Sequence, residues 1–373
     1  MSTSTHTDFH ELDGATLEGG GQLLRNSVAY SALLGKPIFL YNVRAGRPRP
    51  GMQIQHVAAI QLGAQLCNAT TEGAEKRSNF LKLTPGPVTP GHYTMDPGGA
   101  GATPLWLQAS LPCLIFSHEP STLTLRGGTN TGQSQQIDCT IRCLLPFLHQ
   151  YFDLKGLDVR IVRRGYFPKG GGELFVSIPG RPSGAPLPAA TAIERGRVLA
   201  IKGYAYTAGL PVTLANEMRD AAWEFLQYPP NVNHVGYDVP IEIQAVREDD
   251  RAAFGCGSGI ILWAETESGC VITGAALGRR GRSAEDVARE AVDELGTNLA
   301  HGGCLDEYLQ DQLIIFMALA DGQSSISCGP LTMHTRTAIW VAEQMTDATF
   351  QIEQCSETNI SFAVTGSGSN VQP

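Results

Sequence analysis

The histidine at position 334 lies in a sequence context that could make it a nucleophile. A glycine-proline break at residues 329–330 precedes it, and apolar residues at helical spacing follow it, among them Ile339 and Met345. This pattern predicts a helix over residues 335–345 with His334 at its start. The positive end of a helix dipole disfavours the imidazolium, so the ring stays neutral and able to attack a phosphorus atom. A capping or packed histidine is the alternative interpretation.

Two segments near the N-terminus could hold phosphate groups. Glu18-Gly19-Gly20-Gly21 precedes a predicted helix that contains Arg25, and glycines before a helix let backbone N–H groups approach a phosphate. Residues 44–49 follow a predicted strand and contain three arginines, whose planar guanidinium groups match phosphate oxygens. By themselves, the glycines could be an ordinary strand-to-helix turn and the arginines a solvated basic loop.

A third segment mixes basic, aromatic and glycine residues. Residues 163–172 contain Arg163, Arg164 and Lys169 together with Phe167, and they end in three glycines. Cations that follow a backbone and rings that stack on bases are typical of sites for a single nucleic-acid strand. As an isolated hairpin, this segment would be only modest support for such a site.

A fourth group of polar residues lies on a predicted helix over residues 305–319. Tyr308, Asp311 and Gln312 are three and four residues apart, so they project from one face of that helix. A tyrosine, a carboxylate and an amide could together hold a nucleotide and Mg²⁺, which takes one or two carboxylates and completes its shell with substrate phosphates. An exposed helix face with no ligand is the alternative interpretation.

Composition limits the classes of protein to which the chain can belong. Its 373 residues are 42% hydrophobic and carry a net charge of −9, which excludes a generally basic nucleic-acid binder but not a local basic groove. The nine cysteines include no CxxC pair, which favours reduced thiols in an intracellular protein and disfavours a zinc site. We find no apolar run long enough to span a membrane, and the polar residues 1–6 do not resemble a signal peptide.

Alternating strand and helix patterns predict an α/β protein built from three small α/β units. The strands expected in these units cover residues 38–43, 123–125, 157–162, 174–178 and 325–328, and the helices cover residues 24–34, 57–64, 137–148, 305–319 and 335–345. A proline-rich connection over residues 182–188 leads to further helices and strands, which we interpret as a smaller α/β domain inserted at residues 186–300. Residues 1–185 and 301–373 would then form the catalytic domain, with residues 366–370 as a frayed tail.

The motifs, taken in order, resemble those of the RNA 3'-terminal phosphate cyclase family. They are Glu-Gly-Gly-Gly-Gln from Glu18, Arg-Ala-Gly-Arg from Arg44, Gly-Gly-Thr-Asn from Gly127, Phe-Pro-Lys-Gly-Gly-Gly-Glu from Phe167, Glu-Tyr-Leu-Gln-Asp-Gln from Glu307, and His334. The resemblance runs from about Leu12 to Val364 and includes the predicted insert. It implies three repeats of an α/β unit, as in the enolpyruvyl transferases, plus an inserted α/β domain.

The resemblance also implies a reaction in three steps. The histidine matching His334 attacks the α-phosphorus of ATP and forms a histidine–AMP intermediate, AMP passes to an RNA 3'-phosphate, and the adjacent 2'-OH displaces AMP to leave a 2',3'-cyclic phosphate. The implied ATP contacts are Gln108, Tyr308, Asp311 and Gln312. The implied contacts to the RNA terminal phosphate are Arg25, Arg44, Arg47 and Gln55, and the implied ligands of Mg²⁺ or Mn²⁺ are Glu18 and Asp311.

One residue departs from the family pattern. Relatives have a proline near the adenine where this chain has Gln135, so the resemblance leaves the detailed adenine contacts open but still implies the same chemistry. The resemblance further implies an RNA with a 3'-phosphate end as the partner, and a nucleoplasmic protein if the source is eukaryotic or a cytoplasmic one otherwise.

Two other functions compete with this one. Cyclase-like ribosome-assembly proteins share the fold without being enzymes, but they lack the nucleophilic histidine that His334 supplies here. An enolpyruvyl transferase would share only the repeated fold, and a fold alone does not decide a function. Transfer of labelled AMP to the protein separates these possibilities.

Overall fold

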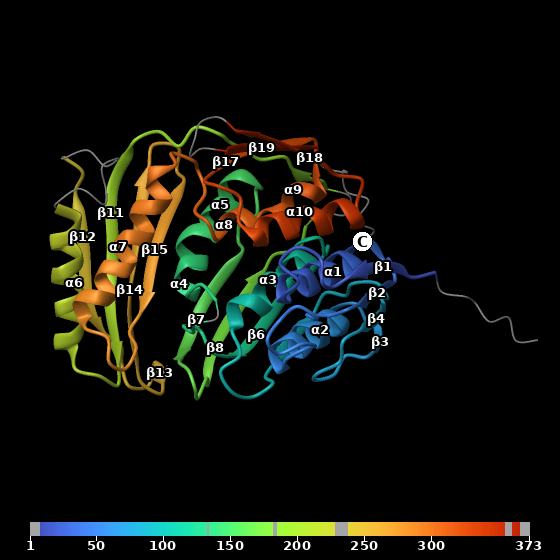
Figure 1. The fold of residues 1–373 in the computed structure, drawn as a ribbon, viewed down its shortest axis with the longest axis horizontal. Coiled ribbons are helices and arrows are strands. Elements are labelled where there is room, and N and C mark those ends of the chain that lie inside the picture. Colours follow the sequence, from blue (N-terminus) through green and yellow to red (C-terminus); the bar gives the residue numbers. More distant parts are fainter. Residues whose placement is uncertain (1–7, 133, 182–184, 228–237, 355–359, 366–373) are drawn as a thin grey trace, which may run out of the picture.

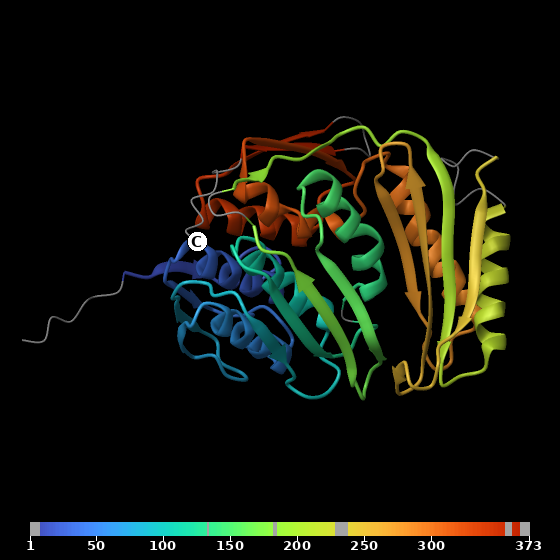
Figure 2. The ribbon, with the colours of Figure 1, turned by 180° about the vertical axis from the view of Figure 1, so that it is seen from behind.

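The computed structural model describes residues 8–132, 134–181, 185–227, 238–354 and 360–365. The chain forms a body of three α/β units with a fourth sheet at one end of the molecule (Figures 1 and 2). Residues 182–184 of the proline-rich connection and the tail at residues 366–370 lie outside the described residues.

The first unit occupies the N-terminal part of the body. Its elements are β1 (His10–Asp13), α1 (Gly21–Leu34), β2 (Ile38–Tyr41), α2 (Ile54–Leu66), β3 (Thr70–Glu72) and β4 (Leu81–Thr84). The strand order is β1-β2-β4-β3, with β1 and β2 parallel and the other pairs antiparallel. Gly35 ends α1 in the left-handed conformation at φ 63°, which glycine adopts without steric cost.

The second unit repeats this plan with longer strands. Its elements are β5 (His92–Met95), α3 (Thr103–Ile115), β6 (Ser121–Gly127), α4 (Ile137–Cys139), a π-helical turn (Thr140–Leu144), α5 (Leu145–Tyr151), β7 (Asp158–Gly165) and β8 (Gly172–Ile178). The order β5-β6-β8-β7 matches the first unit, and the short β13 (Ala253–Phe254) adds to the β7 edge.

The third unit is assembled from both sides of the insert. Its elements are β10 (Thr191–Ala192), α8 (Leu309–Gln312), α9 (Ile314–Leu319), β17 (Gln323–Cys328), α10 (Met333–Met345), β18 (Thr349–Gln354) and β19 (Ile360–Thr365). The order β10-β17-β19-β18 again has a parallel first pair and antiparallel later pairs, so the prediction of three repeated α/β units is confirmed. A minor pair, β9 (Leu187–Pro188) with β16 (Ala320–Asp321), runs beside it.

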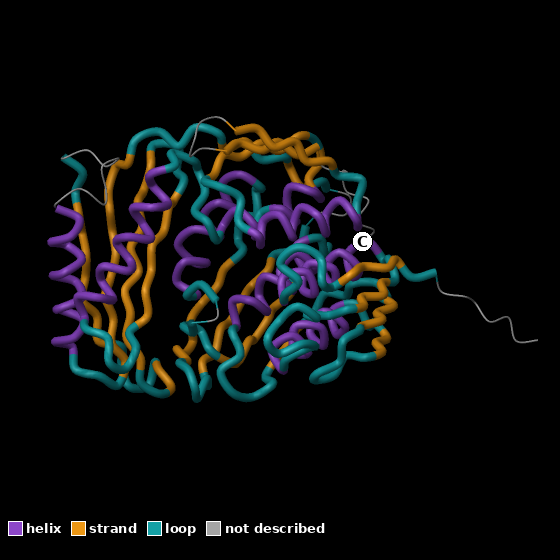
Figure 3. Tube along the Cα trace, viewed as in Figure 1, coloured by secondary structure: helices purple, strands orange, loops and turns teal. Residues whose placement is uncertain are grey.

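Helices of the three units meet at the centre of the body, and the strands lie outside them (Figure 3). Helix α1 packs against α2, α3 and α10, which brings one or more helices of every unit together. This centre is apolar, and Tyr30, Trp106 and Phe152 are fully buried in the core. The packing aligns the N-terminal ends of several helices toward a common region.

The insert is a sheet with helices on one face. Its elements are β11 (Val198–Ala208), α6 (Val212–Gln227), β12 (Ile241–Arg247), β14 (Gly257–Thr266), β15 (Val271–Leu277) and α7 (Ala284–Ala300), with strand order β12-β11-β14-β15. Ile201 and Ala205 of β11 pack in a core with α6 and α7, whereas Tyr206 packs with Tyr166 of the second unit. Since side chains alternate along a strand, β11 buries both of its faces.

The domain limits at residues 186 and 300 stay a prediction, and β9 and β10 at the start of that range pair with strands of the third unit.

The structure differs from two of the predicted helices. The helix expected over residues 305–319 begins at Leu309, because the Asp306 carboxylate accepts hydrogen bonds from the N–H groups of Tyr308 (3.1 Å) and Leu309 (2.8 Å) and holds the chain before them in a turn. The helix expected over residues 137–148 contains a π-helical turn at its centre. Sequence patterns also missed α3 and β11; β11 has no simple alternation since both of its faces are buried.

Candidate active site

A cavity of about 500 Å³ lies where helix N-termini of the three units converge. The starts of α1, α2 and α3 form one side, and α8 and the start of α10 form another. The residues that the resemblance assigned to catalysis, ATP, the RNA phosphate and the metal all line this cavity: Glu18, Arg25, Arg44, Arg47, Gln55, Gln108, Tyr308, Asp311, Gln312 and His334. None of residues 163–172 lines it. Helix N-termini present free N–H groups and a positive dipole, so this arrangement suits a polyphosphate.

His334 occupies the second position of α10 and is exposed to the cavity. The start of the helix is fixed by Thr332, whose side chain accepts a hydrogen bond from the Thr335 N–H at 3.1 Å. The Gln310 amide oxygen accepts from the Thr335 hydroxyl at 2.8 Å and so ties α10 to α8. The predicted place of His334 at a helix start is therefore correct, and these hydrogen bonds hold the first turn of the helix.

Asp311 is linked to the first unit through Gln22. The Gln22 side-chain amide donates to the Asp311 carboxylate at 2.5 Å and accepts from the Arg25 guanidinium at 3.3 Å. Burial raises the pKa of Asp311 to about 6, against the opposing effects of His334, the Gln22 hydrogen bond and Arg25. Burial lowers the pKa of Arg25 to about 10, while Asp311 partly offsets that change.

Glu18 lies in the glycine-rich turn before α1 and lines the same cavity. One oxygen of its carboxylate forms an ion pair with Arg47, and the Arg47 guanidinium also donates to the Glu18 carbonyl at 2.8 Å. The other oxygen, Oε2, is buried and has no hydrogen-bond partner within the described part of the chain. Burial of a carboxylate oxygen without a partner costs free energy unless a cation or a hydrogen-bond donor binds to that oxygen.

Arg44 and His56 both line the cavity, but only the arginine contributes positive charge there. Arg44 donates to the Gly51 carbonyl at 3.0 Å, which holds its side chain along the loop. His56 accepts from the Gln53 N–H at Nδ1 (2.9 Å), and burial, with Arg44 and Arg25 nearby, lowers its pKa to about 3. His56 is therefore a neutral structural residue at pH 7, and Arg44 and Arg25 carry the charge. A Cβ at Gly21 would lie 2.7 Å from His56 Nε2, so glycine is needed there.

The insert supplies a wall of the cavity that sequence patterns did not identify. Residues 275–277, Arg279, Glu290 and Glu294 line it, the last two from one face of α7. Burial is the main cause that raises the pKa of Glu294 to about 8; a hydrogen bond from the Ala275 N–H opposes this shift, and the nearby carboxylates of Glu307, Asp306 and Glu290 add to it. The spacing of Glu290 and Glu294, four residues apart, was a weak signal for this wall. Gln135, where the resemblance implied a departure from the family pattern, also lines the cavity and donates to the Thr273 hydroxyl at 3.3 Å.

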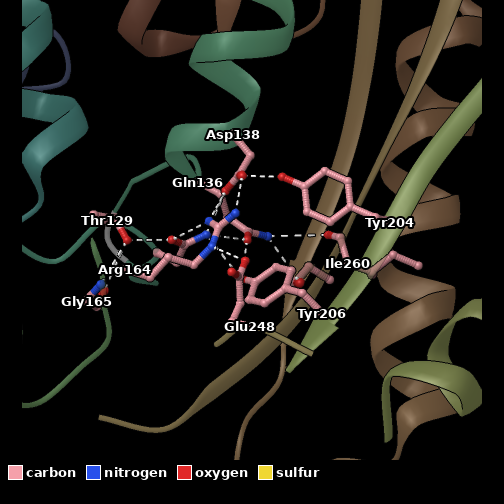
Figure 4. A network of polar contacts seen from close by, with 11 residues as sticks. Thr129, Gln136, Asp138, Arg164, Gly165, Tyr204, Tyr206, Glu248 and Ile260 are labelled. Atoms are coloured by element: carbon pink, nitrogen blue, oxygen red, sulfur yellow. Dashed lines mark hydrogen bonds and ion pairs between the residues drawn. The ribbon is translucent and has the colours of Figure 1, made fainter. Parts of the chain in front are cut away.

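A buried polar network joins the insert to the second unit behind this wall (Figure 4). Arg164 donates to both oxygens of Asp138 and to Glu248, and Asn130 donates to Asp138 and Gln136. Burial opposes ionisation of Asp138, but Arg164, Tyr204 and Asn130 hold its pKa below the usual value. Arg164 is thus a structural residue, whereas Phe167 and Lys169 of the same motif are exposed.

Comparison with known proteins assigns the chain to a family. A family model for RNA 3'-terminal phosphate cyclase matches residues 16–352. A protein from Pyrobaculum neutrophilum named RNA 3'-terminal phosphate cyclase is 37% identical to this chain, over 92% of this chain and 94% of its own length. A protein of the same name from Drosophila melanogaster is 35% identical, over 92% of each chain. The chain belongs to the RNA 3'-terminal phosphate cyclase family. The resemblance predicted from the motifs is confirmed.

Two further observations bear on this cyclase-family chain. None of the described helices is long and apolar enough to cross a membrane. Among the residues that the structure describes, no three His, Cys, Asp or Glu side chains are grouped as a metal site would require.

Proposed function

We propose that this protein converts an RNA 3'-phosphate to a 2',3'-cyclic phosphate at the expense of ATP, through a covalent histidine–AMP intermediate. The observation that carries this proposal is the position of His334, which is exposed to a cavity formed by helix N-termini and lined by Arg25, Arg44 and Arg47. Membership of the cyclase family supports the overall reaction.

In the first step, a ring nitrogen of His334 attacks the α-phosphorus of ATP, and pyrophosphate leaves. Gln108, Tyr308 and Gln312 line the same cavity and would hold the nucleotide. The second position of α10 presents the His334 ring to this cavity, where it can reach the bound nucleotide. Helix N-termini around the cavity would stabilise the charge that develops on the phosphate oxygens.

A divalent cation fits this site when phosphates are present. The unpartnered Glu18 Oε2 and the Asp311 carboxylate would each supply an oxygen to Mg²⁺ or Mn²⁺. Bound there, the cation would neutralise the triphosphate. A full set of protein ligands is not needed for Mg²⁺, which commonly retains waters and substrate oxygens.

In the second step, an oxygen of the RNA 3'-phosphate attacks the phosphorus of the histidine–AMP bond and releases His334. Arg25, Arg44, Arg47 and Gln55 would hold this terminal phosphate, since guanidinium groups bind phosphate oxygens in pairs. In the third step, the adjacent 2'-OH attacks the 3'-phosphorus, AMP leaves, and the cyclic phosphate remains.

Within this proposal the activity is intracellular, in keeping with eight free cysteines in the described chain.

Transfer of label from [α-³²P]ATP tests the proposal against a cyclase-like protein without catalysis. We expect acid-labile labelling of the wild-type protein and of a His118→Ala control, whose histidine is exposed outside the cavity. His334→Ala should neither label nor cyclise a 3'-phosphorylated RNA, although its circular dichroism spectrum stays the same. Wild-type labelling of His334→Ala would refute the intermediate, and absence of cyclisation by the wild type would favour the non-catalytic alternative.

A further inference from the structure

A second cavity, of about 880 Å³, opens beside the first. It lies between the second unit and the insert, and Thr131, Gly132, Leu277 and Arg279 line both cavities. A Cβ at Gly132 would lie 3.6 Å from the Arg279 guanidinium, so that side chain stands at the shared wall. The two cavities are therefore adjoining parts of one surface.

The second cavity is basic in a chain whose net charge is −9. Arg279, Arg280 and Arg282 line it, and its described lining includes no aspartate or glutamate. Arg282 is paired with Glu290, but the guanidinium groups of Arg279 and Arg280 are exposed and form no hydrogen bond or ion pair with the described residues. Unpaired arginines on an acidic protein are a local site for an anion.

An aromatic ring and apolar side chains form the rest of the lining. Phe167 is 73% exposed at the tip of the β7–β8 connection, an unusual position for a phenylalanine without a partner. Leu210, Leu214 and Met218 line the insert side. The start of α7 is not free to bind an anion, because Asp286 and Ser283 cap it reciprocally.

We propose that this second cavity is the path of the RNA strand on the 5' side of its two terminal nucleotides, with Arg280 on its backbone phosphates and Phe167 stacked against a base. The proposal rests on the proposed function, because it extends the RNA site of that reaction. Cations that follow the backbone together with an exposed ring are the combination that binds single-stranded nucleic acid without sequence preference. An acidic peptide would match the arginines but would leave the Phe167 ring without a stacking partner.

Substrates of different length separate this cavity from the reaction itself. We would measure three quantities: labelling by ATP alone, AMP transfer to a 3'-phosphorylated dinucleotide, and AMP transfer to a 3'-phosphorylated decanucleotide. The wild type should use the decanucleotide with a higher kcat/KM than the dinucleotide. Phe167→Ala and Arg280→Ala should each lower kcat/KM for the decanucleotide about tenfold, and leave the other two quantities unchanged.

The salt dependence of binding gives a second, independent measurement. For wild type and Arg280→Ala, the Kd for the decanucleotide would be measured by fluorescence anisotropy at several salt concentrations. Loss of one phosphate contact should reduce the slope of log Kd against log salt by about 0.7. The matched control is Arg251→Ala, which removes an exposed arginine of the insert that lines neither cavity and should keep the wild-type slope.

Each outcome has a definite meaning. Equal use of the two RNA lengths by the wild type, or wild-type behaviour of both variants on the decanucleotide, would overturn the proposed path. Equal loss on both lengths would also overturn it, because Arg280 would then act at the terminal phosphate. Absence of labelling and transfer in the wild type would instead refute the proposed function.

Discussion

Arg164 of β7 and Asp138 of α4 form a buried, two-pronged ion pair in which both N···O distances are 2.8 Å. Both side chains are more than nine-tenths buried, and Tyr204 of β11 donates to the same carboxylate. The pair therefore holds together two elements of the second unit and the face of the insert that covers them. Because α4 follows directly after Gln135 and Gln136 of the cavity lining, this contact also fixes one wall of the site.

Removal of one partner should destabilise the protein strongly. Arg164→Met leaves Asp138 charged and buried, and we expect a loss of about 3–5 kcal/mol in the free energy of unfolding, measured by urea denaturation. Arg164→Met with Asp138→Asn should recover part of that loss. Arg160→Met, which breaks the exposed pair with Asp158, should cost less than about 1 kcal/mol. Equal costs for the two single variants would show that burial does not matter here.

Arg44 and Arg47 should differ in which half-reaction they affect. We assign Arg44 to the RNA terminal phosphate, and its side chain contacts carbonyls of its own loop. Arg44→Ala should therefore slow AMP transfer to RNA roughly 10- to 100-fold and change labelling by ATP little. Arg47 pairs with Glu18, so Arg47→Ala should slow both steps by freeing that carboxylate. Single-turnover rates of the two half-reactions, measured separately, test this difference. Equal losses in both steps for Arg44→Ala would remove it from the RNA site.

Glu294 should make stability fall as the pH rises. The pKa of Glu294 in the folded protein is raised to about 8 from a usual 4.5, so the folded state binds the proton more tightly than the unfolded state does. The resulting contribution to the free energy of unfolding is fully present below about pH 4.5 and is lost as the pH rises to 8. Relative to wild type, Glu294→Gln should therefore gain stability between pH 5 and 8, by at most about 1.4 kcal/mol per pH unit. Urea denaturation at pH 5, 6.5 and 8 measures this, with Glu217→Gln, exposed on α6, as the control. A pH-independent difference would contradict the raised pKa.

Local sequence was sufficient for features that depend on neighbouring residues. Gly35 ends α1 because glycine tolerates the left-handed conformation, and Ser283 with Asp286 starts α7 by a reciprocal cap. The same is true of His334 at the start of α10, since a break followed by helical periodicity marks that point. The order of motifs was also enough to identify the family.

Tertiary structure alone decided which of these side chains meet and in what environment. Gln22 and Asp311 are hydrogen bonded although they are 289 positions apart, and the raised pKa of Asp311 follows from burial that packing creates. Arg164 and Phe167 are three residues apart in one basic, aromatic motif, yet the first is buried in an ion pair and the second is 73% exposed. Sequence determined the local conformations and the kinds of side chain, because these depend on short-range sterics and hydrogen bonds. Only the packing of three units and an insert determined burial, charge partners and the cavities.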